Sequence, residues 1–172
     1  MVGRTPAPGK CFGSPPEVLM GEHVAGTMSI EGGGGGERDR RSAVVLAGGR
    51  STRFGDEDKL LADLVGEPLI RRTVERVAPV VGTVVVNCRA DQQAALETAL
   101  GGVDATLRFA VDPEPDAGPM AGIRTGLRAT PSRFAVVVAG DMPFVAPGLV
   151  RHLFARVTGH DAAVPQVEEW YQ

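Results

Sequence analysis

The stretch that decides the fold reads Val44-Val-Leu-Ala-Gly-Gly-Arg-Ser-Thr-Arg-Phe-Gly-Asp-Glu-Asp-Lys59. Its apolar start leads into the glycine pair Gly48-Gly49, and a polar loop that contains Arg53 then leads to Lys59. Glycines at the end of a strand let backbone N–H groups approach a ligand closely. Lys59 is the only lysine from residue 42 onward, although that part of the chain holds twelve arginines. Because a compact ammonium binds phosphate as a point charge, the stretch predicts a polyphosphate site.

Two familiar phosphate loops do not fit this stretch. The dinucleotide fingerprint requires G-x-G-x-x-G, and Gly48-Gly49 followed by Gly55 lacks that spacing. The Walker loop requires a glycine directly before its lysine, and Asp58 precedes Lys59 instead. A Rossmann-type oxidoreductase is therefore disfavoured, although it stays an alternative.

Composition limits the classes of function. The chain has 172 residues, of which 43% are hydrophobic, so one domain with a sizeable core is expected. The net charge of −3 gives no electrostatic reason to expect a nucleic-acid partner. No apolar run approaches the length of a membrane span. Cys11 and Cys88 are too isolated for a disulfide framework or a metal pair, which favours a reducing cytoplasm.

Residues 1–41 differ in composition from the rest of the chain. They hold 10 of the 23 glycines and 4 of the 13 prolines, including the run Gly32–Gly36. Such a segment buries too little apolar surface to offset its ordering entropy. We expect either a disordered tail or translated sequence upstream of a true start at Met28, with the folded domain covering residues 42–172.

From residue 42 the chain alternates between strand and helix patterns. This repetition is typical of an α/β fold with a mostly parallel sheet and helices on both faces. A brief extended piece is expected over residues 60–65, and Asp91 is expected to cap the helix that carries Leu96 and Leu100. The predicted strands cover residues 43–47, 83–87, 107–111 and 134–139, with a last strand starting at 162–165, and the predicted helices start near Pro68, Asp91, Pro119 and Pro147.

Polar residues follow the predicted strands. Ligands of open parallel sheets lie outside the carboxyl ends of the strands, so Asn87, Asp112 and Asp141 are expected beside the glycine pair. Asp141 follows the most apolar strand, and a carboxylate there suits Mg²⁺ with phosphate oxygens. Each residue also has a structural interpretation: Asn87 and Asp112 as turn residues, and Asp141 as the cap of the helix at Pro147.

The glycine stretch resembles a nucleotidyltransferase signature, L-A-G-G-x-S-x-R-F-G followed by D-K. The resemblance is greatest to the molybdenum cofactor guanylyltransferase family (MobA-like nucleotidyltransferases), since other nucleotidyltransferases more often have L-A-A-G. It implies a three-layer, Rossmann-like fold of the nucleotide-diphospho-sugar transferase type, with residues 42–172 as its nucleotide-binding part. The matching residues are Leu46, Ala47, Gly48, Gly49, Ser51, Arg53, Phe54, Gly55, Asp58 and Lys59.

The resemblance also implies residue roles. Lys59 would contact the phosphates, and Asp141 would bind GTP through Mg²⁺. Lys59, Arg53 and Asp141 would carry the catalysis. The family's nucleotide contacts match Leu46, Ala47, Gly48, Gly49, Lys59, Asn87, Asp112 and Asp141.

The implied reaction transfers GMP from GTP to molybdopterin, releases pyrophosphate and yields the guanine dinucleotide cofactor, with a molybdoenzyme or its chaperone as a further partner. Family members continue well beyond the strand expected at 162–165, so the chain is expected to be truncated at its C-terminal end. Two alternatives stay open. One is a related enzyme with another acceptor, such as cobinamide phosphate or a cytidylyl acceptor, and the other is a non-catalytic GTP-binding module.

The segment from Gly118 to Ile123 resembles the family's G-P-x-A-G-I element. Its small residues either let a ligand lie against a helix start or let the helix pack closely on the sheet through Gly122 and Gly126. The apolar residues Met120, Ile123 and Leu127 are expected to face inward. Arg89 is expected to be a solvated turn residue.

Overall fold

The computed structural model describes residues 36–49, 58–114, 117–167 and 170–171. The chain divides into two units, residues 1–33 and 34–172, and only the second contains described residues. Within the described residues, the first element is the 3₁₀ turn η1 (Glu37–Arg40). The expectation for the tail over residues 1–35 lies outside the described part of the chain.

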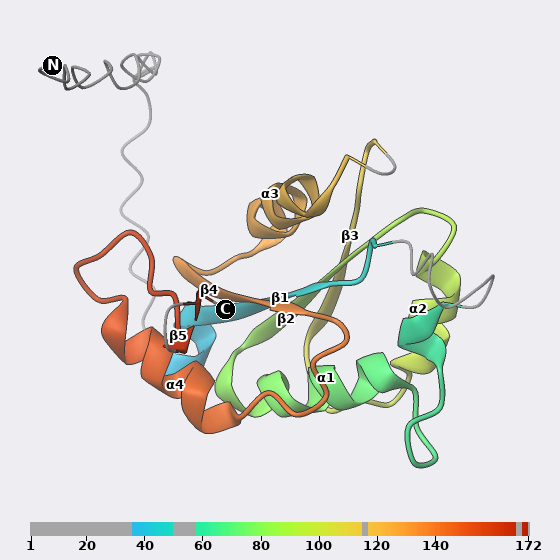
Figure 1. Ribbon diagram of the computed structural model, residues 1–172, viewed down its shortest axis with the longest axis horizontal. Helices are drawn as coiled ribbons and strands as arrows, with labels where there is room; N and C mark the ends of the chain where they lie inside the picture. Colours follow the sequence, from blue (N-terminus) through green and yellow to red (C-terminus); the bar gives the residue numbers. More distant parts are fainter. Residues whose placement is uncertain (1–35, 50–57, 115–116, 168–169, 172) are drawn as a thin grey trace, which may run out of the picture. The chain divides into compact units, whose positions relative to one another are not determined.

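Four parallel strands form the central sheet, in the order β3-β2-β1-β4 (Figure 1). Ser42 of β1 pairs with Thr83 of β2, and Val45 of β1 pairs with Val138 of β4. The two central strands are buried almost throughout, which explains their near-continuous apolar sequence. The α/β fold with a parallel sheet is thereby confirmed. The strands are β1 (Arg41–Leu46), β2 (Thr83–Cys88), β3 (Leu107–Val111) and β4 (Phe134–Ala139).

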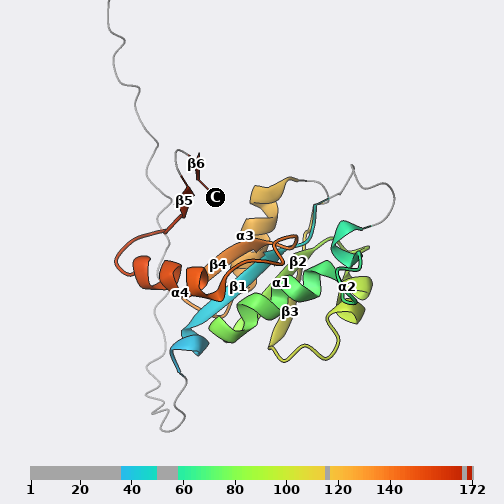
Figure 2. The same ribbon diagram turned by 60° about the horizontal axis from the view of Figure 1, so that its bottom comes forward.

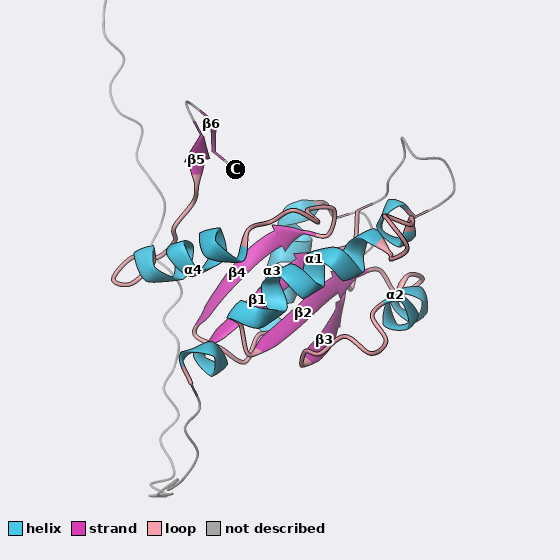
Figure 3. Cartoon of the chain, turned by 90° about the horizontal axis from the view of Figure 1, so that it is seen from below, coloured by secondary structure: helices cyan, strands magenta, loops and turns pink. Residues whose placement is uncertain are grey.

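The helices cover both faces of this sheet, so the three-layer arrangement is also confirmed. Helix α3 packs on one face, and α1 and α4 lie on the other (Figures 1 and 2). Figure 3 shows α1 running across the sheet on that second face. The helices are α1 (Leu69–Val77), α2 (Gln93–Ala99), α3 (Pro119–Ala129) and α4 (Pro147–Arg156).

Helix α1 buries its apolar face. Ile70, Val74 and Val77 are fully buried against the sheet. The helix ends at Val77, and the 3₁₀ turn η3 (Ala78–Val80) follows because Pro79 cannot continue the α-helical hydrogen bonding. The helix predicted to start near Pro68 is therefore confirmed.

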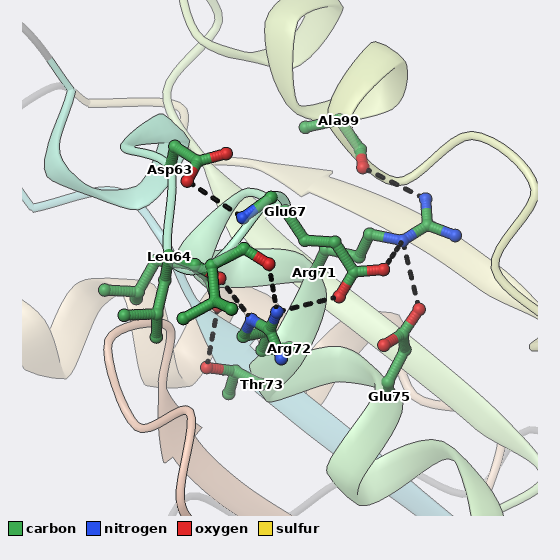
Figure 4. A network of polar contacts seen from close by, with 11 residues as sticks. Asp63, Leu64, Glu67, Arg71, Arg72, Thr73, Glu75 and Ala99 are labelled. Carbon is green, nitrogen blue, oxygen red and sulfur yellow. Dashed lines mark hydrogen bonds and ion pairs between the residues drawn. The ribbon is translucent and has the colours of Figure 1, made fainter.

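Two arginines of α1 hold the preceding loop and the end of α2 in place (Figure 4). Arg72 donates to the carbonyls of Leu64 at 2.6 Å and Val65 at 2.8 Å. Arg71 donates to the carbonyl of Gly101 at 2.8 Å.

The extended piece expected over residues 60–65 is wrong in its first part, because the 3₁₀ turn η2 (Lys59–Leu61) lies there.

Helix α3 packs through glycines instead of through its large apolar residues. Met120 is 73% exposed and Leu127 is 42% exposed, so the predicted inward face is wrong. A Cβ atom added to Gly126 would lie 2.3 Å from Val44 Cγ1, and one added to Gly122 would lie 2.5 Å from Asn87 Oδ1. The helix therefore approaches the sheet too closely for any side chain at these two positions.

The C-terminal part differs from the prediction. Residues 162–165 are not a strand; the strands β5 (Gln166–Val167) and β6 (Trp170–Tyr171) form a short antiparallel pair instead. Among the described residues, we find no helix with the length and apolar character needed to traverse a lipid bilayer.

Candidate functional site

A pocket of about 470 Å³ opens where the sheet's strands end at their carboxyl side. Residues far apart in the sequence meet here because parallel strands point the same way. Arg53, the remaining predicted site residue, lies outside the described residues. The pocket lining includes Leu46, Ala47, Gly48, Gly49, Lys59, Asn87, Asp112 and Asp141, which are the positions that the sequence linked to the nucleotide.

A lysine and a carboxylate meet at the pocket. Lys59 Nζ lies 3.0 Å from Asp141 Oδ2, and the two side chains are 37% and 42% exposed. The structural interpretation of Asp141 as a helix cap is wrong, since Ala146 occupies the N-cap of α4. The pair thus keeps one positive and one negative group at the same rim, both open to a ligand from solvent.

Lys59 is held by its neighbour Asp58. The Asp58 carboxylate accepts a hydrogen bond from the Leu60 backbone N–H at 3.1 Å and thereby caps the turn η2. Its other oxygen accepts from the side-chain amide of Gln92, which is only 5% exposed. The adjacent residues Asp58 and Lys59 therefore have different roles: Asp58 caps the turn η2, and Lys59 lines the pocket.

Asp141 is positioned through Gly140. The Gly140 N–H donates to the Leu46 carbonyl at 2.8 Å, and the Gly140 carbonyl accepts from Thr73 Oγ1 at 2.8 Å. A Cβ atom at Gly140 would lie 2.9 Å from the Leu46 oxygen, so this close approach requires glycine. Thr73 was not among the residues predicted for the site, although a polar residue within the buried face of an amphipathic helix was a signal for it.

Asn87 and Asp112 form one polar unit. Asn87 Nδ2 donates to Asp112 Oδ1 at 2.9 Å and to the Ala110 carbonyl at 3.2 Å, and Asn87 is 2% exposed. These two bonds fix which end of the amide is the acceptor. Asn87 Oδ1 and Asp112 Oδ2 then lie beside Gly48, where a Cβ atom would be 3.4 Å and 2.9 Å from them. The side chains therefore bond each other across two strands, and their acceptor oxygens border the pocket's glycines.

Arg89 is not the solvated turn residue that the sequence suggested. Its side chain is 14% exposed, and its Nη1 donates to the carbonyls of Gly48 and Gly49, both at 3.3 Å. Asp91 does not occupy the N-cap of α2, which falls to Gln92; instead, Asp91 accepts from Arg89 Nε at 3.1 Å. The sequence offered no local signal for these contacts, because they join positions about forty residues apart.

The start of α3 also lines the pocket, at a segment for which the sequence left ligand contact and close packing as alternatives. Ala117, Gly118, Pro119 and residues 121–122 line the pocket. Both interpretations of the glycine-rich segment therefore have structural support, since Gly122 lines the pocket and also packs tightly on Asn87.

The donor set for a metal is small. Among the residues that the structure describes, no group of three or more His, Cys, Asp and Glu side chains could hold an ion. Within the described part of the chain, Asp141 offers the carboxylate that pairs with Lys59 at the rim. Mg²⁺ typically takes one or two carboxylates and completes its shell with phosphate oxygens and water, so a single carboxylate here fits an ion that arrives with a nucleotide.

A parallel sheet with a glycine pair, a lysine and carboxylates at its strand ends defines an α/β domain of the nucleotidyltransferase class. Residues 43–172 match the family described as MobA-like NTP transferase domain, and the chain belongs to this family. The family resemblance inferred from the glycine stretch is thereby confirmed.

Individual relatives agree with this family. The chain is 52% identical over 132 residues to a probable molybdenum cofactor guanylyltransferase of Natronomonas pharaonis, covering 77% of this chain and 64% of that protein. It is 40% identical over 136 residues to a protein of the same name from Methanosarcina acetivorans, covering 78% of this chain and 60% of that protein. The chain thus spans less than two thirds of the length of these relatives.

A solved structure has the same fold. Molybdopterin-guanine dinucleotide biosynthesis protein A from Archaeoglobus fulgidus superimposes with a TM-score of 0.58 at 32% identity. The match covers 76% of this chain and 63% of that one. At this level of identity the likeness extends beyond topology to sequence.

Proposed function

We propose that the chain forms the nucleotide-binding part of a guanylyltransferase that transfers GMP from GTP to molybdopterin. A phosphate oxygen of the acceptor would attack the α-phosphorus of GTP and form a new P–O bond. The bond from the α-phosphorus to the oxygen that bridges to the β-phosphate would break, and pyrophosphate would leave with the electron pair. No covalent nucleophile on the protein is needed, because the acceptor oxygen is already anionic.

The nucleoside would lie at the side of the pocket formed by Asn87 and Asp112, and the glycine pair would lead from there to the phosphates. Guanine offers N–H donors at N1 and N2, and Asp112 Oδ2 and Asn87 Oδ1 are acceptors at this side of the pocket. Leu46 and Ala47 also line the pocket. Adenine lacks the paired donors, so this arrangement supports a preference for GTP over ATP.

The Lys59–Asp141 pair is the observation that carries the proposal. When a triphosphate enters, the Lys59 ammonium would turn from Asp141 to the phosphates, because a polyphosphate has more negative charge than one carboxylate. Asp141 would then be free to hold Mg²⁺ with phosphate oxygens, and the ion, when bound, supplies positive charge that neutralises the triphosphate. Arg53 is proposed to stabilise the departing pyrophosphate. The residues' task is to position the reactants and to neutralise developing charge.

Binding is the first test of this proposal. We expect GTP with Mg²⁺ to raise the melting temperature of the full chain more than CTP or ATP does at the same concentration. Equal shifts for all three nucleotides would remove the basis for guanine recognition. A preference for CTP would favour the cytidylyl alternative instead.

Turnover is the second test. We expect pyrophosphate release when GTP, Mg²⁺ and molybdopterin are supplied together, and none when molybdopterin is omitted. Release with cobinamide phosphate alone would point to the related enzyme with a different acceptor. Tight GTP binding without release for any acceptor would restrict the chain to nucleotide binding. Delivery of the product to a molybdoenzyme or its chaperone, and a cytoplasmic location, remain predictions.

A further inference from the structure

The turn after β2 contacts both ends of the segment that joins Gly49 to Asp58. Arg89 donates to the carbonyls of the glycine pair, and Gln92 donates to Asp58. We propose that Arg89 and Gln92 are positioning residues, which set the glycine pair and Lys59 at a fixed separation before the triphosphate arrives. This inference rests on the proposed nucleotide-binding function of the pocket.

The Arg89 guanidinium contacts the glycine pair on one side and Asp91 on the other. On one side its Nη1 reaches the carbonyls of Gly48 and Gly49 at 3.3 Å each. On the other side its Nε and Nη2 face the two oxygens of Asp91 at 3.1 and 3.4 Å. This two-point contact with a carboxylate holds the guanidinium plane in one orientation. Arg89 lies behind the glycine pair and is not among the residues that line the pocket.

The carbonyl contacts determine how the glycine pair faces a ligand. The peptide group is planar and trans, so its C=O and N–H point in opposite directions. Because the Gly48 carbonyl is directed at Arg89, the N–H of Gly49 is directed away from Arg89. A carbonyl oxygen turned toward a phosphate would repel it, whereas N–H groups with a cation behind them attract it. Arg89 therefore selects the loop orientation that suits an anion.

Gln92 connects the same turn to Lys59. Its Oε1 accepts from the Arg89 backbone N–H at 3.3 Å, and its Nε2 donates to Asp58. Asp58 in turn caps the turn that begins at Lys59. Gln92 is 5% exposed and uses both ends of its amide, so its orientation is fixed. A shift of the turn after β2 would therefore move both groups that we assign to the phosphates.

Because these contacts exist before the ligand binds, they should increase the affinity for the triphosphate. A glycine pair is the most flexible backbone in a chain, and ordering it during binding would reduce the affinity. Contacts already made in the free protein remove that cost for the part of the ligand that touches the loop. The effect should therefore fall on the terminal phosphates and leave the nucleoside contacts at Asn87 and Asp112 intact.

The test compares GTP with GMP on the full chain by calorimetry, both with Mg²⁺. We expect Arg89→Met and Gln92→Met to weaken GTP binding about tenfold or more, the size of one lost hydrogen bond to a charged group, with GMP binding changed about threefold or less. Arg108→Met and Gln93→Met are matched controls, since Arg108 is an exposed residue of β3 and Gln93 donates a hydrogen bond to Glu97 on its own helix. Both controls should leave the GTP-to-GMP affinity ratio unchanged.

Each outcome decides the proposal. Unchanged GTP affinity in a folded variant, or an equal loss for GTP and GMP, would overturn the positioning role. If Arg89→Met does not fold, as judged by circular dichroism, Arg89→Lys replaces it. Lysine keeps the charge but not the planar fork, so a reduced GTP-to-GMP ratio is expected, and the wild-type ratio would overturn the proposal. Failure of the wild-type chain to bind GTP would instead contradict the proposed function itself.

Discussion

Lys59 Nζ and Asp141 Oδ2 lie 3.0 Å apart across a sequence separation of 82 residues. They reach the same point because η2 lies beyond the glycine pair that follows β1 and Asp141 lies just beyond β4, the neighbouring strand. The pair is open to solvent, so it contributes little to stability as an ion pair. Its geometry suits exchange of partners when a triphosphate and a metal arrive together.

The first prediction concerns this pair. Lys59→Met and Asp141→Asn should each reduce the rate of pyrophosphate release by about 10²–10³, the usual effect of removing one preorganised charge contact. Both variants should change the free energy of unfolding by about 1 kcal/mol or less, because the pair is exposed. Stopped assays of pyrophosphate and urea titrations measure the two quantities.

Asp161→Asn is the matched control for Asp141→Asn, since Asp161 is exposed in the turn after α4 and does not line the pocket. It should retain wild-type turnover. Near-normal turnover in Lys59→Met or Asp141→Asn would contradict the roles assigned to them.

The second prediction is that alanine substitutions at two helical glycines change the free energy of unfolding in opposite directions. Gly126→Ala should lower the free energy of unfolding by about 1–3 kcal/mol, because the new Cβ would lie 2.3 Å from Val44 Cγ1 and force α3 away from the sheet. Gly148→Ala should raise it by about 0.5–1 kcal/mol, since the space around Gly148 is open and alanine favours the helix. Urea denaturation measures both, and the same sign of change for the two variants would be inconsistent with this packing.

The sequence predicted the sheet and its strand ends because those depend on local patterns. Runs such as Val84-Val85-Val86 form strands wherever both faces are covered, and parallel strands bring their ends together. The packing of α3 was not predictable in this way. Its apolar residues have helical spacing, but the steric fit of Gly122 and Gly126 against the sheet decides which face turns inward.

The residues of the candidate site also fall into a group that the sequence predicted and a group that it did not. Asn87, Asp112 and Asp141 could be predicted because each lies at or just beyond the carboxyl end of a strand. Arg89 and Gln92 could not, since their partners Gly48 and Asp58 lie on another segment and no spacing rule connects them. The partners of such long side chains depend on how distant segments pack in three dimensions, and a single sequence does not show that packing.

The third prediction concerns the support of Asp141. Thr73→Val keeps the shape of the side chain but removes the hydroxyl that bonds the Gly140 carbonyl at 2.8 Å. The buried carbonyl loses its partner, so the free energy of unfolding should fall by about 1–3 kcal/mol. Because Gly140 precedes Asp141, the apparent affinity for Mg²⁺ in the presence of GTP should fall as well.

Thr73→Ser provides the control, since it keeps the hydroxyl and loses one methyl group. It should cost about 1 kcal/mol in unfolding free energy and leave the Mg²⁺ dependence of GTP binding unchanged. Identical Mg²⁺ titrations for the valine and serine variants would show that the hydroxyl does not position Asp141.

The fourth prediction concerns Cys88, the fully buried thiol next to Asn87. Burial, and secondarily the negative charge of Asp112, raises the pKa of Cys88 from 9.0 to about 11. In the folded protein the thiol is therefore neutral at pH 8. In a Cys11→Ser background we expect no reaction with a thiol reagent until the protein is unfolded by urea.

The same shift in pKa links Cys88 to stability. The unfolded chain loses the Cys88 proton near pH 9, whereas the folded chain keeps it until about pH 11. The folded state therefore binds more protons in this interval, and the contribution of Cys88 to stability is full below pH 9 and is lost as the pH rises to about 11. Urea titrations from pH 8 to 11 should show a smaller decline in Cys88→Ala than in its parent, because alanine has no proton to lose. An equal decline in both proteins would mean that the thiol titrates normally in the folded state.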